Sequence, residues 1–283
     1  MLSILIPVYN YNITPLVKEL YGQVLDCGIN FEILVYDDAS TLNISNNKTI
    51  NQFKNTAFKE LPKNIGRSAI RNLLAHDAKY KWLLFLDADT FPENKDFIKQ
   101  YLSNLNHNII MGGIAISEKI PKKEYKLRWL FTKKRERKTN SSANFVIKKN
   151  IFKTFPFDES LKKYGYEDVL FFNTLIKNNE DVYAIKNRVY HNTDDDANAF
   201  LKKTENAIEN LMHLEKNNKI EKEDSKILQY YSKLETLKLT KFMTHLFQIF
   251  RKLLIKNFNS SLPSLFLYDF YRLGYYCLIK NKK

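Results

Sequence analysis

The chain has 283 residues, 44% of them hydrophobic and 14% aromatic, which is enough apolar material for one large α/β domain with a helical extension. Seven glycines and seven prolines exclude a fibrous or low-complexity chain, and the hydrophobic content excludes a disordered one. The net charge of +14 indicates attraction to phosphates, but composition does not choose among nucleic acid, nucleotide, lipid headgroup and acidic glycan.

Cysteine usage and the chain ends bear on the compartment. Cys27 and Cys277 lie far apart and lack metal-ligand spacing, so we expect a reducing cytoplasm. The stretch from Met1 to Pro7 lacks the basic start and cleavage site of a signal peptide. Asp269 and Arg272 interrupt the last apolar stretch, so we expect no membrane-spanning segment.

The N-terminal part predicts a strand, a helix and a second strand. The β-rich run from Leu2 is closed by Pro7 and Asn10, which predicts a strand that leads directly into a loop. Thr14-Pro15 is typical of a helix start. The second apolar run, from Phe31 to Tyr36, ends in acids. A right-handed crossover between these strands would make them parallel.

A basic helix start follows at residues 64–72. Gly66 would allow a close approach of the backbone, and Arg67 and Arg71 lie four positions apart near the positive end of the predicted helix. This pair could hold a diphosphate through charge-assisted hydrogen bonds. A solvated helix face has the same pattern, so the motif leaves both interpretations open.

The run from Trp82 to Leu86 predicts a strand buried on both faces of a parallel sheet. Asp87 and Asp89 follow it on one side, at the sheet edge where α/β folds bind ligands. Two carboxylates there suit a divalent cation that also binds substrate phosphates. A turn cap at Asp87 beside a solvated Asp89 explains the same residues about equally well.

Two further candidate positions lie later in the chain. Glu167 and Asp168 begin a predicted helix, where negative charge is favourable and where a simple cap would also place acids. His191 follows a predicted strand at 188–190, and a structural or exposed histidine is the usual alternative to a ligand there.

Two segments suggest binding to a surface. Residues 118–138 are strongly basic with Trp129 among the cations, which fits a solvated loop as well as an acceptor- or lipid-facing flap. From Asn198 onward, apolar residues recur at helical spacing among basic ones. Such helices suit an anionic membrane surface, although packing on the sheet or a dimer contact would give the same pattern.

Four motifs in this order resemble the donor half of a family-2 glycosyltransferase with the A-type (GT-A) nucleotide-sugar fold: Ile4–Asn10, Tyr36–Ser40, Gly66–Asn72 and Asp87–Asp89. Gly165-Tyr-Glu-Asp168 resembles the acceptor-side motif of that family. The resemblance covers residues 1–191 and implies a Rossmann-like, mostly parallel sheet flanked by helices. We therefore expect a catalytic domain at 1–195 and a helical C-terminal region at 196–283.

The resemblance also implies roles for the donor site. Pro7, Tyr9 and Asp38 would hold the base and ribose of a nucleotide sugar, with UDP as the expected nucleotide. Asp87 and Asp89 would hold Mn2+ or Mg2+ that bridges the diphosphate, and the family pattern adds His191 as a further ligand. Gly66, Arg67 and Arg71 would complete the donor site.

On the acceptor side, Asp168 would be the catalytic base and Glu167 would contact the acceptor hydroxyl. The implied reaction is inverting transfer of a hexosyl or N-acetylhexosaminyl group to a glycan or lipid-linked acceptor. We expect a role in surface-polysaccharide assembly in the cytoplasm, with a peripheral position on the inner face of the cell membrane and homo-oligomerisation left open.

Two alternatives belong to other classes. Leu83–Thr90 resembles the nucleophile motif of haloacid-dehalogenase-like phosphatases, but Phe91 stands where that family has Thr or Val, and a strand–helix unit precedes the motif. A non-catalytic basic protein that binds nucleotides or membranes would explain the charge. It would not explain acids after Tyr36, Leu86 and Tyr166, which also argue against nucleic acid as the partner.

Overall fold

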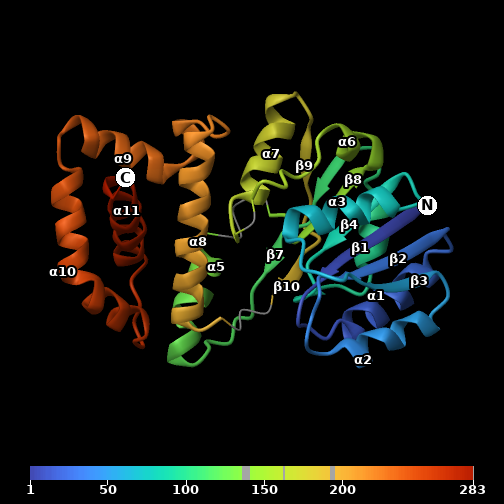
Figure 1. Cartoon of the computed structure of the whole chain (residues 1–283). Helices are drawn as coiled ribbons and strands as arrows, with labels where there is room; N and C mark the ends of the chain where they lie inside the picture. Colours follow the sequence, from blue (N-terminus) through green and yellow to red (C-terminus); the bar gives the residue numbers. More distant parts are fainter. Residues whose placement is uncertain (136–140, 162, 192–194, 283) are drawn as a thin grey trace. The chain divides into compact units, whose positions relative to one another are not determined.

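The computed structural model describes residues 1–135, 141–161, 163–191 and 195–282 (Figure 1). Positions 136–138 of the basic segment lie outside these ranges. By their contacts the described residues form two compact units. The sheet unit lies within 1–116, 137–162 and 167–192, and the helical unit within 117–136, 163–166 and 193–283. Part of the basic segment thus belongs to the helical unit.

A seven-stranded sheet in the order β3-β2-β1-β4-β8-β6-β9 organises the sheet unit. Its strands are β1 (Leu2–Val8), β2 (Phe31–Asp37), β3 (Thr56–Glu60), β4 (Trp82–Leu86), β6 (Ile109–Met111), β8 (Asn144–Lys148) and β9 (Val182–Ala184). All neighbours are parallel except β8, which is antiparallel to β4 and β6. The predicted α/β fold with a mostly parallel sheet is confirmed.

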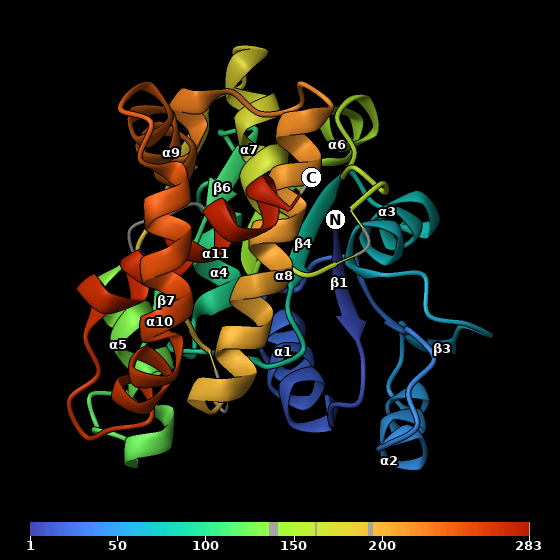
Figure 2. The ribbon, with the colours of Figure 1, turned by 60° about the vertical axis from the view of Figure 1, so that its left-hand side comes forward.

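Helices cover both faces of this sheet (Figures 1 and 2). They are α1 (Thr14–Asp26), α2 (Ile44–Lys48), α3 (Arg67–Asp77), α4 (Phe97–Leu102), α6 (Lys149–Thr154) and α7 (Glu167–Lys177), with a 3-10 turn, η1, at Thr49–Gln52. Alternation along β1 sends Ile4 towards α1 and α4, and Leu5 towards α3, α6 and α7. Because β4 is fully buried between these layers, its carboxyl end is held at a fixed position.

A second sheet of three short strands lies beside the carboxyl end of β4. The strands are β5 (Thr90–Pro92), β7 (Ile114–Ala115) and β10 (Val189–His191), in the order β5-β10-β7. The sequence from Pro92 to Leu105 predicts one helix. Only α4 is helical in the structure, because the chain first pairs with β10 as β5.

The sequence from Asn108 to Ile116 predicts one strand. In the structure this segment is split between the two sheets, with β6 in one and β7 in the other. The chain changes sheet at Gly112 and Gly113. A Cβ on Gly112 would lie 2.3 Å from the carbonyl oxygen of Asn187, and Gly113 has φ +82°. Only glycine permits both the close approach and this backbone conformation.

The helical unit contains α5 (Lys126–Lys134), α8 (Ala197–Lys216), α9 (Lys226–Thr236), α10 (Thr240–Phe258) and α11 (Leu265–Asn281), with 3-10 turns η2 (Lys123–Tyr125) and η4 (Lys222–Asp224). In Figures 1 and 2, α11 runs between α8 and α10. Phe200, Phe247, Phe258 and Tyr271 belong to its apolar core. No helix in the part of the chain that the structure describes has the length and apolar character needed to cross a bilayer.

Candidate active site

Asp87 leaves β4 in a fixed position and carries a buried ion pair. Its backbone N–H donates to the carbonyl of Ala143, 3.1 Å away, and its carboxylate accepts a hydrogen bond from Arg71. The Arg71 side chain is only 1% exposed. Burial works to raise the pKa of the Asp87 carboxyl, but the positive groups of Arg71, Arg67 and His191 outweigh it and lower that pKa. Asp87 is therefore held as a carboxylate.

Asp89 and His191 meet because β5 pairs with β10. In this antiparallel pair His191 stands opposite Thr90, the residue after Asp89. The Nε2 atom of His191 lies 3.4 Å from Oδ2 of Asp89. The Nδ1 atom of His191 is buried and has no hydrogen-bond partner among the described residues. The pairing of two short strands thus brings residues one hundred positions apart into one site.

The Asp89–His191 pair fits a hard divalent cation that takes further ligands from its substrate. The described residues contain no group of three or more His, Cys, Asp or Glu side chains that could hold a metal ion alone. Mg2+ is commonly bound by one or two carboxylates plus substrate phosphates, and imidazole nitrogen suits transition metals such as Mn2+. The donor set at this position is consistent with either ion.

The loop before α3 is anchored by Asp38, which follows β2. The two carboxylate oxygens of Asp38 accept hydrogen bonds from the backbone N–H groups of Ile65, at 2.7 Å, and Gly66, at 3.0 Å. Burial raises the pKa of the Asp38 carboxyl, and these hydrogen bonds oppose the rise. Gly66 has φ +87° and begins α3. Asp38 therefore fixes the loop from which Arg67 projects.

Pro7 and Tyr9 lie at the same edge of the sheet as Asp38. Pro7 is paired in register with Tyr36 of the parallel strand β2, and the N–H of Asp38 donates to the carbonyl of Val8 at 2.9 Å. Tyr9 follows the end of β1 and its side chain is exposed. The loops after β1 and β2 are therefore adjacent.

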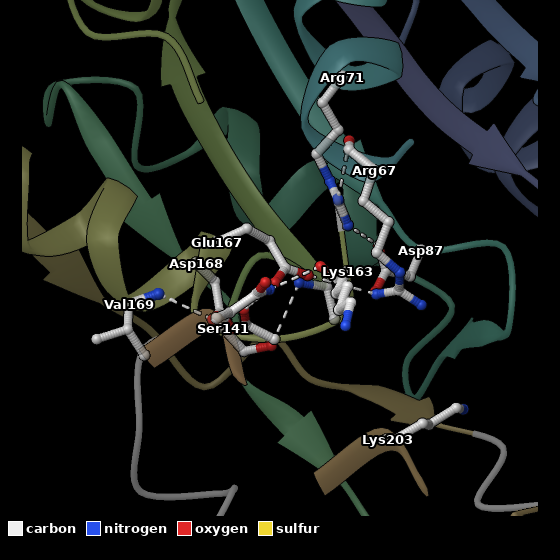
Figure 3. A network of polar contacts seen from close by, with 12 residues as sticks. Arg67, Arg71, Asp87, Ser141, Lys163, Glu167, Asp168, Val169 and Lys203 are labelled. Carbon is white, nitrogen blue, oxygen red and sulfur yellow. Dashed lines mark hydrogen bonds and ion pairs between the residues drawn. The ribbon is translucent and has the colours of Figure 1, made fainter. Parts of the chain in front are cut away.

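Arg67 links the donor side of the site to the first turn of α7. Figure 3 shows its side chain beside Arg71 and Asp87, with Glu167 and Asp168 facing them. Its Nη1 lies 3.7 Å from Oε1 of Glu167. The other carboxylate oxygen of Glu167, Oε2, is buried without a hydrogen-bond partner among the described residues. Asp168 accepts a 2.8 Å hydrogen bond from the N–H of Val169.

Two positioning contacts were missed in the sequence. The Asn10 side chain accepts hydrogen bonds from the N–H groups of Thr41, at 2.8 Å, and Leu42, at 3.1 Å, which ties together the loops after β1 and β2. Arg188 binds both carboxylate oxygens of Glu93, at 2.8 and 3.0 Å, and so clamps β10 to the segment after β5. An asparagine directly after a predicted strand is a signal for Asn10, because asparagine tolerates the positive φ that it adopts here (+52°), whereas nothing local signals the Arg188–Glu93 pair.

Comparison with known proteins gives a consistent picture. The family model "Glycosyl transferase family 2" matches residues 3–165. Uncharacterized glycosyltransferases of Rickettsia felis and Rickettsia conorii are 33% identical over 121 residues and 34% identical over 123 residues. These matches cover 43% of this chain and only 20% of each relative, so the chain spans about a fifth of their length.

Solved structures share the fold at low sequence identity. S. aureus TarS 1-349 in complex with UDP has a TM-score of 0.53 and 17% identity, covering 99% of this chain and 91% of that one. The mannosyltransferase PcManGT from Pyrobaculum calidifontis, in complex with GDP-Man and Mn2+, has a TM-score of 0.52 and 11% identity, covering 73% and 61%. Since the family model spans more than half of the chain and includes its donor motifs and D-x-D segment, the alternatives of a phosphatase and a non-catalytic basic protein are set aside, and the chain belongs to glycosyl transferase family 2.

Proposed function

We propose that the protein is an inverting glycosyltransferase that moves a sugar from a nucleoside diphosphate, UDP by preference, to a hydroxyl group of a glycan or lipid-linked acceptor. The proposal rests on a connected series of contacts between charged side chains in the sheet unit. Asp89 adjoins His191, Asp87 is paired with Arg71, and Arg67 reaches from this group to Glu167, next to Asp168. Solved structures that share the fold bind UDP or GDP-Man with Mn2+, which supports a nucleotide-sugar donor and a divalent ion.

In this proposal the donor is held between the loops after β1 and β2 and the start of α3. Pro7, Tyr9 and Asp38 contact the nucleoside, with Gly66 allowing the backbone close to it. Arg67 contacts the diphosphate, while Arg71 keeps Asp87 oriented. Asp89 and His191, supported by Asp87, would hold Mn2+ or Mg2+, which as a Lewis acid would stabilise the leaving diphosphate.

Asp168 accepts the proton of the acceptor hydroxyl as that oxygen bonds to the anomeric carbon and the bond from this carbon to the phosphate oxygen breaks. The nucleoside diphosphate leaves from the opposite face, so a single displacement inverts the anomeric configuration. Glu167 has a buried carboxylate oxygen with no hydrogen-bond partner among the described residues, and this oxygen can accept a hydrogen bond from the acceptor and hold it in line. We place the reaction on the cytoplasmic side of the cell membrane.

Asp168→Asn separates catalysis from binding. We expect the variant to bind UDP as the wild type does and to transfer sugar about 10²- to 10⁴-fold more slowly, because the base is lost while the donor site is unchanged. Calorimetric titration with UDP and Mn2+, and single-turnover transfer or hydrolysis with a panel of nucleotide sugars, measure the two quantities. A variant with undiminished transfer would remove Asp168 from the role of base.

Asp89→Ala tests the cation site. We expect Mn2+ to raise the melting temperature of the wild type in the presence of UDP and to have no such effect on the variant, because one of its two ligands is gone. Asp26→Ala, an exposed acid at the end of α1, is the matched control and should respond as the wild type does. An unchanged response of Asp89→Ala to Mn2+ would refute the assignment of this site.

A further inference from the structure

Helix α10 presents an apolar stripe that the core of the helical unit does not use. Its side chains are Phe242, Ile249, Phe250 and Leu253, which are 58%, 55%, 43% and 61% exposed. At 100° per residue these positions fall within one third of the helix circumference. Four large apolar side chains on one exposed face form a patch of the kind that marks an interaction site.

An adjacent face of α10 already makes the packing contacts of the helix. Met243, Phe247, Leu254 and Phe258 are buried there. The Phe247 ring lies 5.2 Å from that of Tyr271 and so close to Gly274 of α11 that a Cβ on this glycine would lie 2.7 Å from it. In Figures 1 and 2, α11 runs along one side of α10. The exposed stripe is therefore additional to the packing that the fold requires.

Positive charge borders the stripe, and negative charge is absent from this part of the sequence. No Asp or Glu occurs between Glu235 and Asp269, whereas five cations do: Lys238, Lys241, Arg251, Lys252 and Lys256. Arg251 is paired with Glu205 of α8 at 2.9 Å. Lys241, Lys252 and Lys256 are exposed, and the helical period places all three along one flank of the stripe. An apolar face with a cationic flank is complementary to a surface that is anionic outside and apolar beneath.

Exposed apolar side chains also lie beyond both ends of α10. Leu237 and Leu239 precede the helix and are 65% and 40% exposed. Leu262 follows it in the loop and is 81% exposed, and Phe266 in the first turn of α11 is 79% exposed. A second copy of this chain would bring the same cations towards one another, whereas anionic lipid headgroups would neutralise them. Because α10 is no membrane-spanning helix, a bilayer would take it up parallel to its surface.

We propose that α10 is a membrane-docking helix that lies in the headgroup region of an anionic bilayer, with Phe242, Ile249, Phe250 and Leu253 inserted below the headgroups and Lys241, Lys252 and Lys256 contacting lipid phosphates. The membrane location comes from the proposed function, and α10 is the surface of the protein that we assign to it. The test of this assignment does not measure sugar transfer. Such docking would hold the enzyme at the surface where a lipid-linked acceptor resides.

Vesicle co-sedimentation of the full chain tests the proposal. We expect the protein to sediment with vesicles of mixed phosphatidylglycerol and phosphatidylcholine, to remain in solution with phosphatidylcholine alone, and to be released by high salt. Ile249→Ser/Leu253→Ser and Lys241→Gln/Lys252→Gln/Lys256→Gln should each weaken binding by about tenfold or more. Leu25→Ser/Ile176→Ser, which removes two equally exposed apolar side chains elsewhere, should bind as the wild type does.

Other outcomes would overturn the proposal. The proposal would be wrong if the wild-type protein did not sediment with anionic vesicles. It would also be wrong if the lysine variant bound these vesicles as strongly as the wild type. A wild-type dimer in light scattering that Ile249→Ser/Leu253→Ser converts to a monomer would assign the stripe to contacts between copies. The lysine variant changes only exposed charges, so its loss of binding cannot be attributed to unfolding. UDP-dependent thermal stabilisation should be the same in all variants, which separates failure of this proposal from failure of the proposed function.

Discussion

Arg67 and Arg71 lie one turn apart on α3, yet their surroundings differ. Arg71 is 1% exposed and bound to Asp87, whereas the Arg67 side chain is 47% exposed and faces Glu167 across 3.7 Å. A buried guanidinium with a carboxylate partner is costly to remove, because the partner is left as an uncompensated buried charge. An exposed guanidinium is free to adjust to a ligand and contributes little to folding.

We therefore expect opposite effects from two matched substitutions. Arg71→Met should lower the free energy of unfolding by about 3–5 kcal/mol, as is typical when one member of a buried ion pair is removed. Arg67→Met should change it by less than about 1 kcal/mol but weaken UDP binding by about tenfold or more, because a charge-assisted contact to phosphate is lost. Denaturant unfolding and calorimetry measure both quantities, and equal loss of stability in the two variants would contradict this division of roles.

At the scale of elements, the crossing between β6 and β7 determines where β10 and His191 lie. Asn144 of β8 donates to the carbonyls of Gly113, at 3.1 Å, and Asn187, at 2.8 Å, and accepts from the Tyr101 hydroxyl at 2.6 Å. This buried network joins β8, which is paired with β4, to the segment that leads into β10. The seven-stranded sheet and the three-stranded sheet are thereby held in one arrangement around Asp89.

Gly112→Ala should disturb this crossing. The added Cβ would lie 2.3 Å from both the Asn187 carbonyl oxygen and the Tyr101 hydroxyl. Because the Asn187 oxygen belongs to the backbone, it has little freedom to move away from the new methyl group. We expect a loss of about 1–3 kcal/mol in unfolding free energy, as for an overpacked core, together with weaker Mn2+ dependence of UDP binding.

Gly22→Ala is the control. Apart from the chain neighbours and the backbone of α1 itself, no atom of the described residues lies within 4 Å of its added Cβ, so this substitution should stabilise the protein by about 0.5–1 kcal/mol. A Gly112→Ala protein as stable as the wild type would contradict the close approach.

Elements with their own local signal were predictable from the sequence. The uninterrupted apolar runs of β1, β2 and β4 indicated buried parallel strands, and the acids after β2 and β4 marked the edge where the site lies. The three-residue strand β5 carries no periodic pattern, so its pairing with β10 could not be derived locally, and His191 was placed by resemblance alone. Helical spacing placed Arg67 and Arg71 on one face of α3. Their unequal burial depends on contact with β4, and helical spacing does not encode that contact.

At the scale of the whole molecule, the burial of tyrosine side chains makes the stability of both units depend on pH in the alkaline range. In the helical unit, three hydroxyls of α11 donate to glutamates of α8: Tyr271 to Glu205 at 2.7 Å, Tyr275 to Glu209 at 2.9 Å and Tyr276 to Glu215 at 2.5 Å. Burial, then the hydrogen bond to the carboxylate, raises the pKa of each phenol, to about 12 for Tyr271. Burial also raises the pKa of Tyr36 and of Tyr101 in the sheet unit.

These shifts predict a steep loss of stability above about pH 10, where an unfolded tyrosine ionises. The folded-state pKa is the higher one, so the stabilisation is complete below the unfolded pKa and is lost as the pH rises towards the folded pKa, near 12 for Tyr271. Each such tyrosine should lower the unfolding free energy by about 1.4 kcal/mol per pH unit in this range. During alkaline titration, exposed tyrosines such as Tyr230 should ionise first, without loss of structure. A second rise in the ultraviolet absorbance of tyrosinate should then coincide with the loss of the helical circular-dichroism signal, because the buried phenols ionise only on unfolding. Tyr271→Phe should make the loss of stability with pH less steep, because one buried phenol is removed while Glu205 keeps its 2.9 Å contact with Arg251. Tyr230→Phe alters a side chain that is 56% exposed and should leave the pH dependence unchanged. Ionisation of all 17 tyrosines in a protein that keeps its full helical signal would show that the α8–α11 hydrogen bonds do not restrain these hydroxyls.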